Sequence, residues 1–404
     1  MTPIRTDSSN PFAHRTIRVR FPGLIDDILE GLPHLDRARR AALTALRDEL
    51  VGNAPLSMFD PPAPDYDPWT SYVGEHAQRM APAQPSWQNA EWFLAEHLFF
   101  RRIIGAVRYW ETALDPFKPA KEKERTSLLL AEQLDALLEN ARPEDRVRGS
   151  LLFALWGNRM DLSHEDASAI ASGGQGHDPS ALIADQSQDA LKLLHRAREA
   201  VHIVCDNAGT ELAGDLCLTD WLLHHGCGSV FLHVKFHPTF VSDATTLDVR
   251  QLIEGLTAAS SPGRRKLGER LEAAFVAGRL RICPDFFWNS PRFFDALPPR
   301  ILGLFADADL IIIKGDLNYR RLLRDTIVPA GDPLERWASP LPAPAVILRT
   351  MKGDPLAGID ADRRRALDAE HPGWRVAGRH GVIQTLSATS QQGPGHRPAP
   401  SPCP

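Results

Sequence analysis

The sequence has few cysteines, no long apolar run and only a small net charge. Its 404 residues include five cysteines, an odd number with no CxxC pair, which favours a reducing compartment over a disulfide scaffold. No apolar run reaches the roughly 18 residues of a membrane span, and Met1–Asn10 lacks the apolar segment of a secretory signal. A net charge of −5 argues against a protein that binds nucleic acid by neutralising phosphates. We therefore expect a cytoplasmic protein with no nucleic-acid partner and no membrane partner.

Several well-known nucleotide and hydrolase motifs are also missing. The sequence contains no GxGxxG, no P-loop and no GxSxG, so dinucleotide binding and serine-hydrolase chemistry lose their usual sequence support. Lysine, asparagine and tyrosine are scarce, with 8, 8 and 4 residues beside 38 arginines. This usage is typical of a high-GC bacterial genome. We therefore give weight to the places where lysines and asparagines cluster.

Apolar residues recur at helical spacing through the first half of the chain, which predicts a helical N-terminal subdomain over residues 16–184. The clearest helical patterns cover residues 21–51, 92–114, 128–138 and 151–155. Between residues 53 and 86, prolines and scattered aromatics predict irregular structure. The polar ends of the chain are expected to be a flexible tail at residues 1–15 and a disordered tail at residues 387–404.

From about residue 185, short β-type runs alternate with helical stretches. The runs that we interpret as strands are 201–205, 230–236, 280–283, 309–314 and 345–348. Residues 376–385 are expected to add a closing strand pair. Strands that alternate with helices predict a parallel sheet covered on both faces. The predicted fold class is α/β, with the helical subdomain packed on a three-layer core, residues 185–386, that contains a mostly parallel sheet.

Polar side chains follow four of these strands, at the sheet edge where α/β proteins bind ligands. They are Asp206, Asn207 and Glu211 after the first strand, Asp243 after the second, Asp316, Asn318, Tyr319 and Arg320 after the fourth, and Arg349, Thr350 and Lys352 after the fifth. Three of the eight lysines, Lys235, Lys314 and Lys352, lie in or beside these segments. The scarce residue types therefore gather at one edge of the predicted sheet.

This set of side chains suits metal-assisted phosphate chemistry. Asp206, Asn207 and Asp243 offer the hard oxygen ligands that Mg²⁺ or Mn²⁺ prefers, and Lys352 with neighbouring arginines is suited to hold an anion. A divalent ion beside a basic clamp can neutralise phosphoryl oxygens and activate a nucleophile. Taken singly, each residue also fits a turn, a helix cap or a solvated charge. A zinc site is less favoured, because the spacing of the cysteines and histidines matches no zinc ribbon or finger.

The same segments resemble a known family. DNAGTE (206–211), VSDAT (241–245), KGDLNYRRL (314–322) and RTMK (349–352) resemble the damage-control phosphatases, formerly domain of unknown function 89. The RTxK element resembles the subfamily whose eukaryotic members are also called acidic-residue methyltransferases. Further similarity lies in WFLAEHLFFRRI (92–103), DPF (115–117) and LWGNRMDLS (155–163), so that the resemblance covers about residues 21–356.

The resemblance implies a metal-dependent phosphatase that acts on small phosphometabolites such as sugar phosphates, with Mn²⁺, Mg²⁺, Co²⁺ or Ni²⁺ as the ion. By position, Asp206, Asn207 and Asp243 match the metal ligands, and with Lys352 they are the expected catalytic residues. The substrate-binding residues expected from the matching segments and the RTxK element are Glu211, Asp316, Asn318, Tyr319, Arg320, Arg349, Thr350 and Lys352. The nucleophile, metal-bound water or a carboxylate such as Asp206, stays open.

Two other functions stay open on the sequence. One is a protein carboxyl (glutamate) O-methyltransferase that uses S-adenosylmethionine, in which Glu211 would contact that cofactor. It has poor support, because no glycine-rich nucleotide loop follows the first core strand. The other is a non-catalytic metal-binding relative. Asn158 and Asp161 are polar residues in a largely apolar segment, and they are candidates for lining the mouth of the site or for capping a helix.

Overall fold

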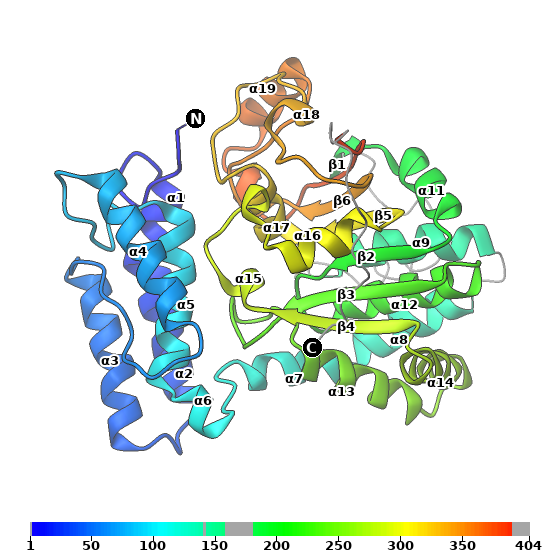
Figure 1. The fold of residues 1–404 in the computed structure, drawn as a ribbon, viewed down its shortest axis with the longest axis horizontal. Helices are drawn as coiled ribbons and strands as arrows, with labels where there is room; N and C mark the ends of the chain where they lie inside the picture. Colours follow the sequence, from blue (N-terminus) through cyan, green and yellow to red (C-terminus); the bar gives the residue numbers. More distant parts are fainter. Residues whose placement is uncertain (1, 140–142, 158–180, 390–404) are drawn as a thin grey trace.

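The computed structural model describes residues 2–139, 143–157 and 181–389. It confirms the predicted fold class: N-terminal helices stand beside an α/β core with a seven-stranded, mostly parallel sheet (Figure 1). No helix in these ranges is long and apolar enough to cross a membrane. The expected C-terminal tail from residue 390 onward lies outside the described residues, as do Asn158 and Asp161.

The sheet has the strand order β1-β7-β6-β5-β2-β3-β4. Its strands are β1 (Leu182–Asp185), β2 (Ala200–Val204), β3 (Ser229–Lys235), β4 (Leu280–Asp285), β5 (Leu310–Lys314), β6 (Ala345–Thr350) and β7 (Gly381–Leu386). The five adjacent strands β6, β5, β2, β3 and β4 run parallel to one another. At the other side β7 pairs antiparallel with β6, and β1 pairs parallel with β7. The carboxyl ends of β6, β5, β2 and β3 therefore meet along one edge.

The five strands predicted in the core are confirmed, with shifts of one or two residues at their ends. The predicted closing strand pair is wrong, because residues 376–385 contribute the single strand β7, which fills the place between β6 and β1. Strand β1 was not predicted. It has four residues at the rim of the sheet, and this length is too short for a periodicity to stand out.

Helices cover both faces of the sheet, as a parallel sheet requires. One face packs against α8 (Leu128–Leu138), α9 (Pro143–Trp156), α11 (Ser187–Arg196), α12 (Thr210–His224), α13 (Thr246–Thr257) and α14 (Pro262–Val276). The other face packs against α15 (Phe286–Asn289), α16 (Pro299–Ala306), α17 (Gly315–Leu322), α18 (Leu334–Trp337) and α19 (Ala361–Glu370). Alternation along β5 fits this arrangement, since Leu310 and Ile312 join the first cluster and Ile311 and Ile313 the second.

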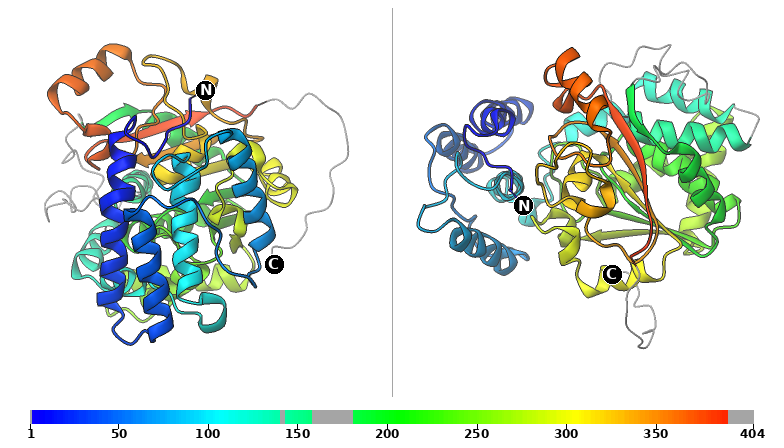
Figure 2. Two further views of the ribbon diagram at one scale, coloured as in Figure 1. Left: turned by 90° about the vertical axis from the view of Figure 1, so that its left-hand side faces the viewer. Right: turned by 90° about the horizontal axis from the view of Figure 1, so that it is seen from above.

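The first helices form a separate layer beside the core (Figure 2). They are α1 (Pro11–Arg15), a π-helical turn (Thr16–Arg20), α2 (Phe21–Gly31), α3 (Arg37–Val51), α4 (Tyr66–Met80) and α5 (Trp92–Ala106), with α6 (Tyr109–Thr112) and α7 (Lys118–Arg125) leading into the core. The boundary at residues 184 and 185 stays a prediction. Helices α8 and α9 precede that boundary in the chain, yet they share the hydrophobic cluster of the sheet.

Two expectations for the N-terminal part are wrong. Residues 53–86 are not irregular throughout, because α4 buries Trp69, His76 and Met80 on one face, and the prolines stand at its flanks and in its first turn. The described part of the first 15 residues is no free tail. Ile4 is buried, its N–H donates to the carbonyl of Asp325 over 3.2 Å, and its carbonyl accepts from Trp92 over 2.8 Å.

Candidate active site at the carboxyl edge of the sheet

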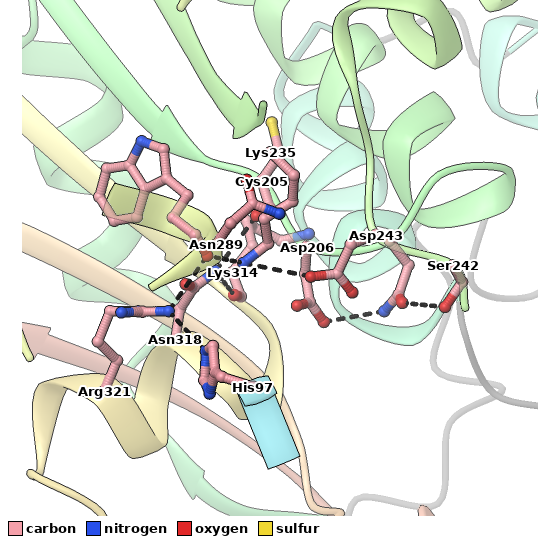
Figure 3. Close-up of polar contacts among 12 residues, drawn as sticks. His97, Cys205, Asp206, Lys235, Ser242, Asp243, Asn289, Lys314, Asn318 and Arg321 are labelled. Carbon is pink, nitrogen blue, oxygen red and sulfur yellow. Dashed lines mark hydrogen bonds and ion pairs between the residues drawn. The ribbon is translucent and has the colours of Figure 1, made fainter. Parts of the chain in front are cut away.

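Four predicted segments meet where β2, β3, β5 and β6 end, because these strands are neighbours in the sheet. Asp206 follows β2 after one residue, and Asp243 lies in the loop that leaves β3. Figure 3 shows that the carboxylates of Asp206 and Asp243 lie close together, with Asn318 and Lys314 arriving from α17 and the end of β5. The structure thus brings together residues that are more than a hundred positions apart in the chain.

Backbone pairing holds the two acidic segments against each other. Asn207 and Asp243 form an antiparallel bridge. On either side of it, the Ala208 N–H donates to the Ser242 carbonyl over 2.6 Å, and the Ala244 N–H donates to the Asp206 carbonyl over 2.8 Å. The spacing of the predicted metal ligands is therefore fixed by main-chain bonds.

The side chain of Asn207 links three polar groups of the site. Its Nδ2 donates to Asp206 Oδ2 over 2.8 Å and to Glu211 Oε2 over 3.0 Å. Its Oδ1 accepts from the hydroxyl of Ser242. Because a hydroxyl both donates and accepts, Ser242 can serve either orientation of this amide. An amide rotated by half a turn presents Oδ1 to the side of Asp206, as a metal ligand must.

Gly315 makes room for the Asp206 carboxylate. This glycine has φ +82°, and a Cβ placed on it would lie 1.9 Å from Asp206 Oδ2. A side chain at position 315 is therefore excluded both by the left-handed backbone and by the carboxylate itself. The N-terminus of α17 begins at this residue, and backbone N–H groups at a helix start favour anions.

The acidic groups are crowded and shielded from water. Burial raises the pKa of Asp206 well above its usual range, and the neighbouring charges of Glu211 and Asp243 raise it further. Burial likewise raises the pKa of Asp243, although Lys235 opposes this. The Lys235 ammonium lies 3.2 Å from Asp243 Oδ2 and donates to the Trp288 carbonyl over 2.8 Å. Burial lowers the pKa of this lysine.

Glu211 belongs to a buried ion cluster behind the site. Lys314 is fully buried, and its Nζ lies 2.8 Å from Glu211 Oε1 and 2.9 Å from Asp215 Oδ1. Burial lowers the pKa of Lys314, but the two carboxylates outweigh burial and raise it above its usual value. Burial raises the pKa of Asp215 to about 7. Both Glu211 oxygens are thus bound to protein groups.

Asp316 and Arg349 hold the RTxK loop in place. Asp316 Oδ1 accepts from Arg349 Nε over 2.8 Å and from the backbone N–H of Lys352 over 2.9 Å. Arg349 is fully buried and also donates to the carbonyls of Gly353 and Pro355. Both side chains were predicted to contact substrate, and both have protein partners here. Their arrangement sets the position of Lys352.

Four more predicted substrate residues are also engaged with the protein. Tyr319 is fully buried, and its hydroxyl donates to Gln384 Oε1 over 3.1 Å. Arg320 forms ion pairs with Glu96 and Asp325, and Thr350 donates to the Leu155 carbonyl over 2.8 Å. Asn318 donates from Nδ2 to the Lys314 carbonyl, and its buried Oδ1 has no hydrogen-bond partner among the described residues.

Lys352 differs from the other cations near the site. It is half-buried, and no ion pair or hydrogen bond joins its Nζ to another residue in the described ranges. Its charge partly opposes the burial that raises the pKa of Asp206 and of Glu124, so the ammonium lies within electrostatic range of both carboxylates. It is therefore the cation best placed to meet an anionic ligand beside Asp206.

Sequence reasoning left several residues of this site unassigned. Ser242 and Gly315 were inside matched segments, but a hydroxyl and a glycine carry no chemical signal of their own. Asp215 lies one helical turn after Glu211, within a helix that is buried on all sides. The scarcity of lysine was a usable signal, because Lys235 and Lys314 are the buried partners of Asp243 and Glu211.

The oxygen atoms at this edge fit a divalent cation. Asn318 Oδ1 is buried without a hydrogen-bond partner among the described residues, and the carboxylates of Asp206 and Asp243 repel each other. A hard cation relieves both defects. No cluster of three or more His, Cys, Asp or Glu side chains in the described ranges is arranged to hold a metal. A site here must therefore combine two carboxylates with an amide oxygen.

Comparisons with known proteins agree on one family. The model of the damage-control phosphatase ARMT1-like domain matches residues 22–367. The damage-control phosphatase ARMT1 of Danio rerio is 28% identical, and the alignment covers 94% of this chain and 96% of that protein. The human ARMT1 is 27% identical, with 92% and 96% covered.

Among solved structures, a DUF89 family protein from Pyrococcus horikoshii has the same fold. Its TM-score is 0.50 at 15% sequence identity, and the match covers 94% of this chain and 98% of that chain. The family model spans most of the chain, including every segment that meets at the sheet edge. The protein therefore belongs to the damage-control phosphatase ARMT1-like family.

Proposed function

We propose that the protein is a divalent-metal-dependent phosphatase that hydrolyses small phosphorylated metabolites such as sugar phosphates. The observation that carries this proposal is the buried group of Asp206, Asn207 and Asp243 at the carboxyl edge of the sheet, with the Lys352 ammonium within electrostatic range of Asp206. Family membership supports the reaction class. The ion, Mn²⁺, Mg²⁺, Co²⁺ or Ni²⁺, and the metabolite are part of the proposal.

In this proposal Asp206, Asn207 and Asp243 hold the ion through oxygen atoms. Once bound, such an ion neutralises phosphoryl oxygens and activates the attacking group. Lys352 binds a phosphate oxygen through its ammonium, and Asp316 keeps that lysine in position through its bond to the Lys352 N–H. The N-terminus of α17 adds a partial positive charge beside the phosphate.

The buried cluster of Lys314, Glu211 and Asp215 has a supporting role. The Lys314 ammonium balances two carboxylates that would otherwise add negative charge behind Asn207. Glu211 Oε2 also accepts from Asn207 Nδ2, and this bond must break when the amide turns its Oδ1 towards an ion beside Asp206. Because both Glu211 oxygens have protein partners, the geometry gives no specific support to a contact with S-adenosylmethionine. We therefore do not propose a methyltransferase.

The proposal is tested by hydrolysis of p-nitrophenyl phosphate with chelator-stripped protein, to which Mg²⁺, Mn²⁺, Co²⁺ or Ni²⁺ is returned separately. We expect turnover with at least one ion, and a loss of about 100-fold or more in Asp206→Asn, because a neutral amide replaces an anionic ligand. Asp189→Asn is the matched control, since the Asp189 side chain is exposed and pairs with Lys192 at the surface of α11. Turnover that persists in chelator, or survives in Asp206→Asn, contradicts the proposal.

A panel of phosphate esters then identifies the substrate class. Sugar phosphates are expected to give higher kcat/KM values than p-nitrophenyl phosphate. If the stripped protein binds Mn²⁺ but hydrolyses no ester in the panel with any of the four ions, the non-catalytic metal-binding relative replaces the phosphatase as the better interpretation.

A further inference from the structure

The loop that carries Asp243 has an unusual backbone. Phe240 and Val241 have φ values of +49° and +68°, in the left-handed region. Such a value is an outlier for a β-branched residue such as Val241. The Ser242 N–H donates to the Phe240 carbonyl over 2.8 Å, two residues back. This bond around a residue of positive φ marks a tight three-residue turn of a rare and strained kind.

Strain of this kind persists only where the surroundings hold it, and it gathers at functional sites. The segment is fastened on both sides of the turn. Before it, the Asn289 amide accepts from the Phe236 N–H and donates to the His237 carbonyl. After it, Ser242 and Ala244 are bonded to the Asp206–Ala208 backbone. These bonds fix the ends of the segment. Across the turn itself the Asp243 N–H donates to the Thr239 carbonyl over a long 3.3 Å, so side-chain packing has to supply the rest of the support.

The ring of Phe240 provides this packing, through contacts with α5. It packs against Phe100 and His97 of α5, with centroid distances of 4.6 and 4.9 Å. The Lys235 ammonium, which pairs with Asp243, lies 5.8 Å from the same ring centroid. Both Phe240 and Val241 pack against the hydrophobic cluster of the N-terminal helices. A side chain of the ligand-bearing loop is thus inserted into a different layer of the protein.

We propose that Phe240 is a positioning residue for the metal site, and that its insertion between α5 and the loop holds the Val241 turn and thereby sets Ser242 and Asp243 against Asp206 and Asn207. The inference rests on the proposed function, because it assigns Asp243 to the ion. It also gives α5 a role, since the side chains of its His97 and Phe100 contact this ring. Removal of the ring lets the turn relax and moves the Asp243 carboxylate.

Mn²⁺ titration calorimetry on the full-length, metal-stripped protein tests this role. We expect Phe240→Ala to weaken Mn²⁺ binding by about 10- to 100-fold, the usual effect of losing a group that orients a metal ligand. Phe236→Ala is the matched control, because its ring lies four residues earlier and packs on Phe286 and on Trp110 of α6 instead of α5. It should leave the affinity unchanged. Phe240→Leu keeps an apolar side chain in the site and serves if the alanine variant does not fold.

A second variant separates turn strain from loss of packing. Glycine adopts a left-handed backbone at no steric cost, so Val241→Gly added to Phe240→Ala should restore part of the lost Mn²⁺ affinity. Hydrogen exchange on the metal-free proteins gives a readout that needs no ion. Peptides that contain the Ala208 and Ala244 amides should exchange faster in Phe240→Ala than in wild type or Phe236→Ala.

The outcomes distinguish this inference from the function on which it rests. If wild type and Phe240→Ala bind Mn²⁺ equally and exchange equally, Phe240 does not position the site, and the proposed function stands. If wild-type protein binds none of Mn²⁺, Mg²⁺, Co²⁺ and Ni²⁺, both fail. Equal losses in Phe240→Ala and Phe236→Ala also overturn the inference, since they show general loosening of the loop.

Discussion

Gly315→Ala is the substitution that the geometry of the site constrains most sharply. A Cβ at position 315 would lie 1.9 Å from Asp206 Oδ2 and 2.1 Å from its carboxyl carbon. Ordinary contact begins at 3.4 Å, so the carboxylate must retreat by about 1.5 Å, the difference between 3.4 and 1.9 Å. The φ of +82° adds backbone strain of about 1–2 kcal/mol for any residue other than glycine.

The two effects have different consequences and can be measured separately. Strain should lower the free energy of unfolding by about 1–2 kcal/mol, as measured by urea denaturation. Displacement of the proposed metal ligand Asp206 by more than 1 Å should lower kcat/KM for phosphate-ester hydrolysis by about 100-fold, and it should weaken Mn²⁺ binding.

Gly373→Ala is the control for strain alone. Gly373 has φ +84°, and nothing lies within 4 Å of a Cβ placed on it. This variant should lose similar stability and keep wild-type activity. The reasoning is refuted if Gly315→Ala retains activity within about threefold of wild type, or if Gly373→Ala loses as much activity as Gly315→Ala.

Three further predictions concern titratable and charged side chains. Burial lowers the pKa of His202 to about 2 and that of His233 to about 3. Both stay neutral in the folded protein, while the unfolded chain takes up protons below about pH 6.5, so stability is lost as the pH falls. Each histidine should lower the free energy of unfolding by about 2 kcal/mol between pH 7 and pH 5. Urea denaturation at the two pH values should show that His202→Leu loses about 2 kcal/mol less than wild type over this range. An equal loss in the variant and the wild type would contradict burial of His202 in its neutral form. Lys314→Met leaves two buried carboxylates without their cation and should lower the free energy of unfolding by about 3–5 kcal/mol, whereas Lys192→Met at the surface should change it by less than about 0.5 kcal/mol. Lys352→Met should reduce kcat/KM by about 10- to 100-fold through loss of a charged hydrogen bond to phosphate, while calorimetry finds unchanged Mn²⁺ affinity; unchanged kinetics would show that Lys352 does not contact the substrate.

The core of the fold was predictable because its strands are short apolar runs between helices. Strands such as β5, with four consecutive apolar residues, are buried on both faces, and this pattern has few alternatives in an α/β chain. Strand β7 was harder to place. Residues 376–385 contain one short apolar run after a glycine-rich turn, and nothing local to them indicates that this strand lies between β6 and β1.

The helix α4 shows a different limit of sequence reasoning. Prolines around residues 61–85 indicate irregular structure, but proline is compatible with the first turn of a helix and with its flanks. The apolar spacing of Trp69, His76 and Met80 would have predicted the helix, had histidine been counted as a buried residue. Burial of His76 depends on packing that the local sequence does not contain.

The candidate site was likewise predictable only in part. The convergence of Asp206, Asn207 and Asp243 was predictable from the expected parallel sheet, because the carboxyl ends of parallel strands meet at one edge. The state of the basic residues did not follow. The sequence shows Arg349 only as a cation near the expected anion site. The structure shows that its guanidinium is bound by Asp316 and two backbone carbonyls. Among the predicted cations of this edge, Lys352 is the one without such partners in the described ranges.

The central claim is that Asp206, Asn207 and Asp243 together hold a divalent ion. Anomalous diffraction from crystals soaked in Mn²⁺ tests it most directly, because the ion is located without reference to activity. The account predicts an anomalous peak at bonding distance from the carboxylates of Asp206 and Asp243 and from the Asn207 amide oxygen, and no such peak in Asp206→Asn crystals. A peak elsewhere on the chain, or none at this edge of the sheet, would contradict it.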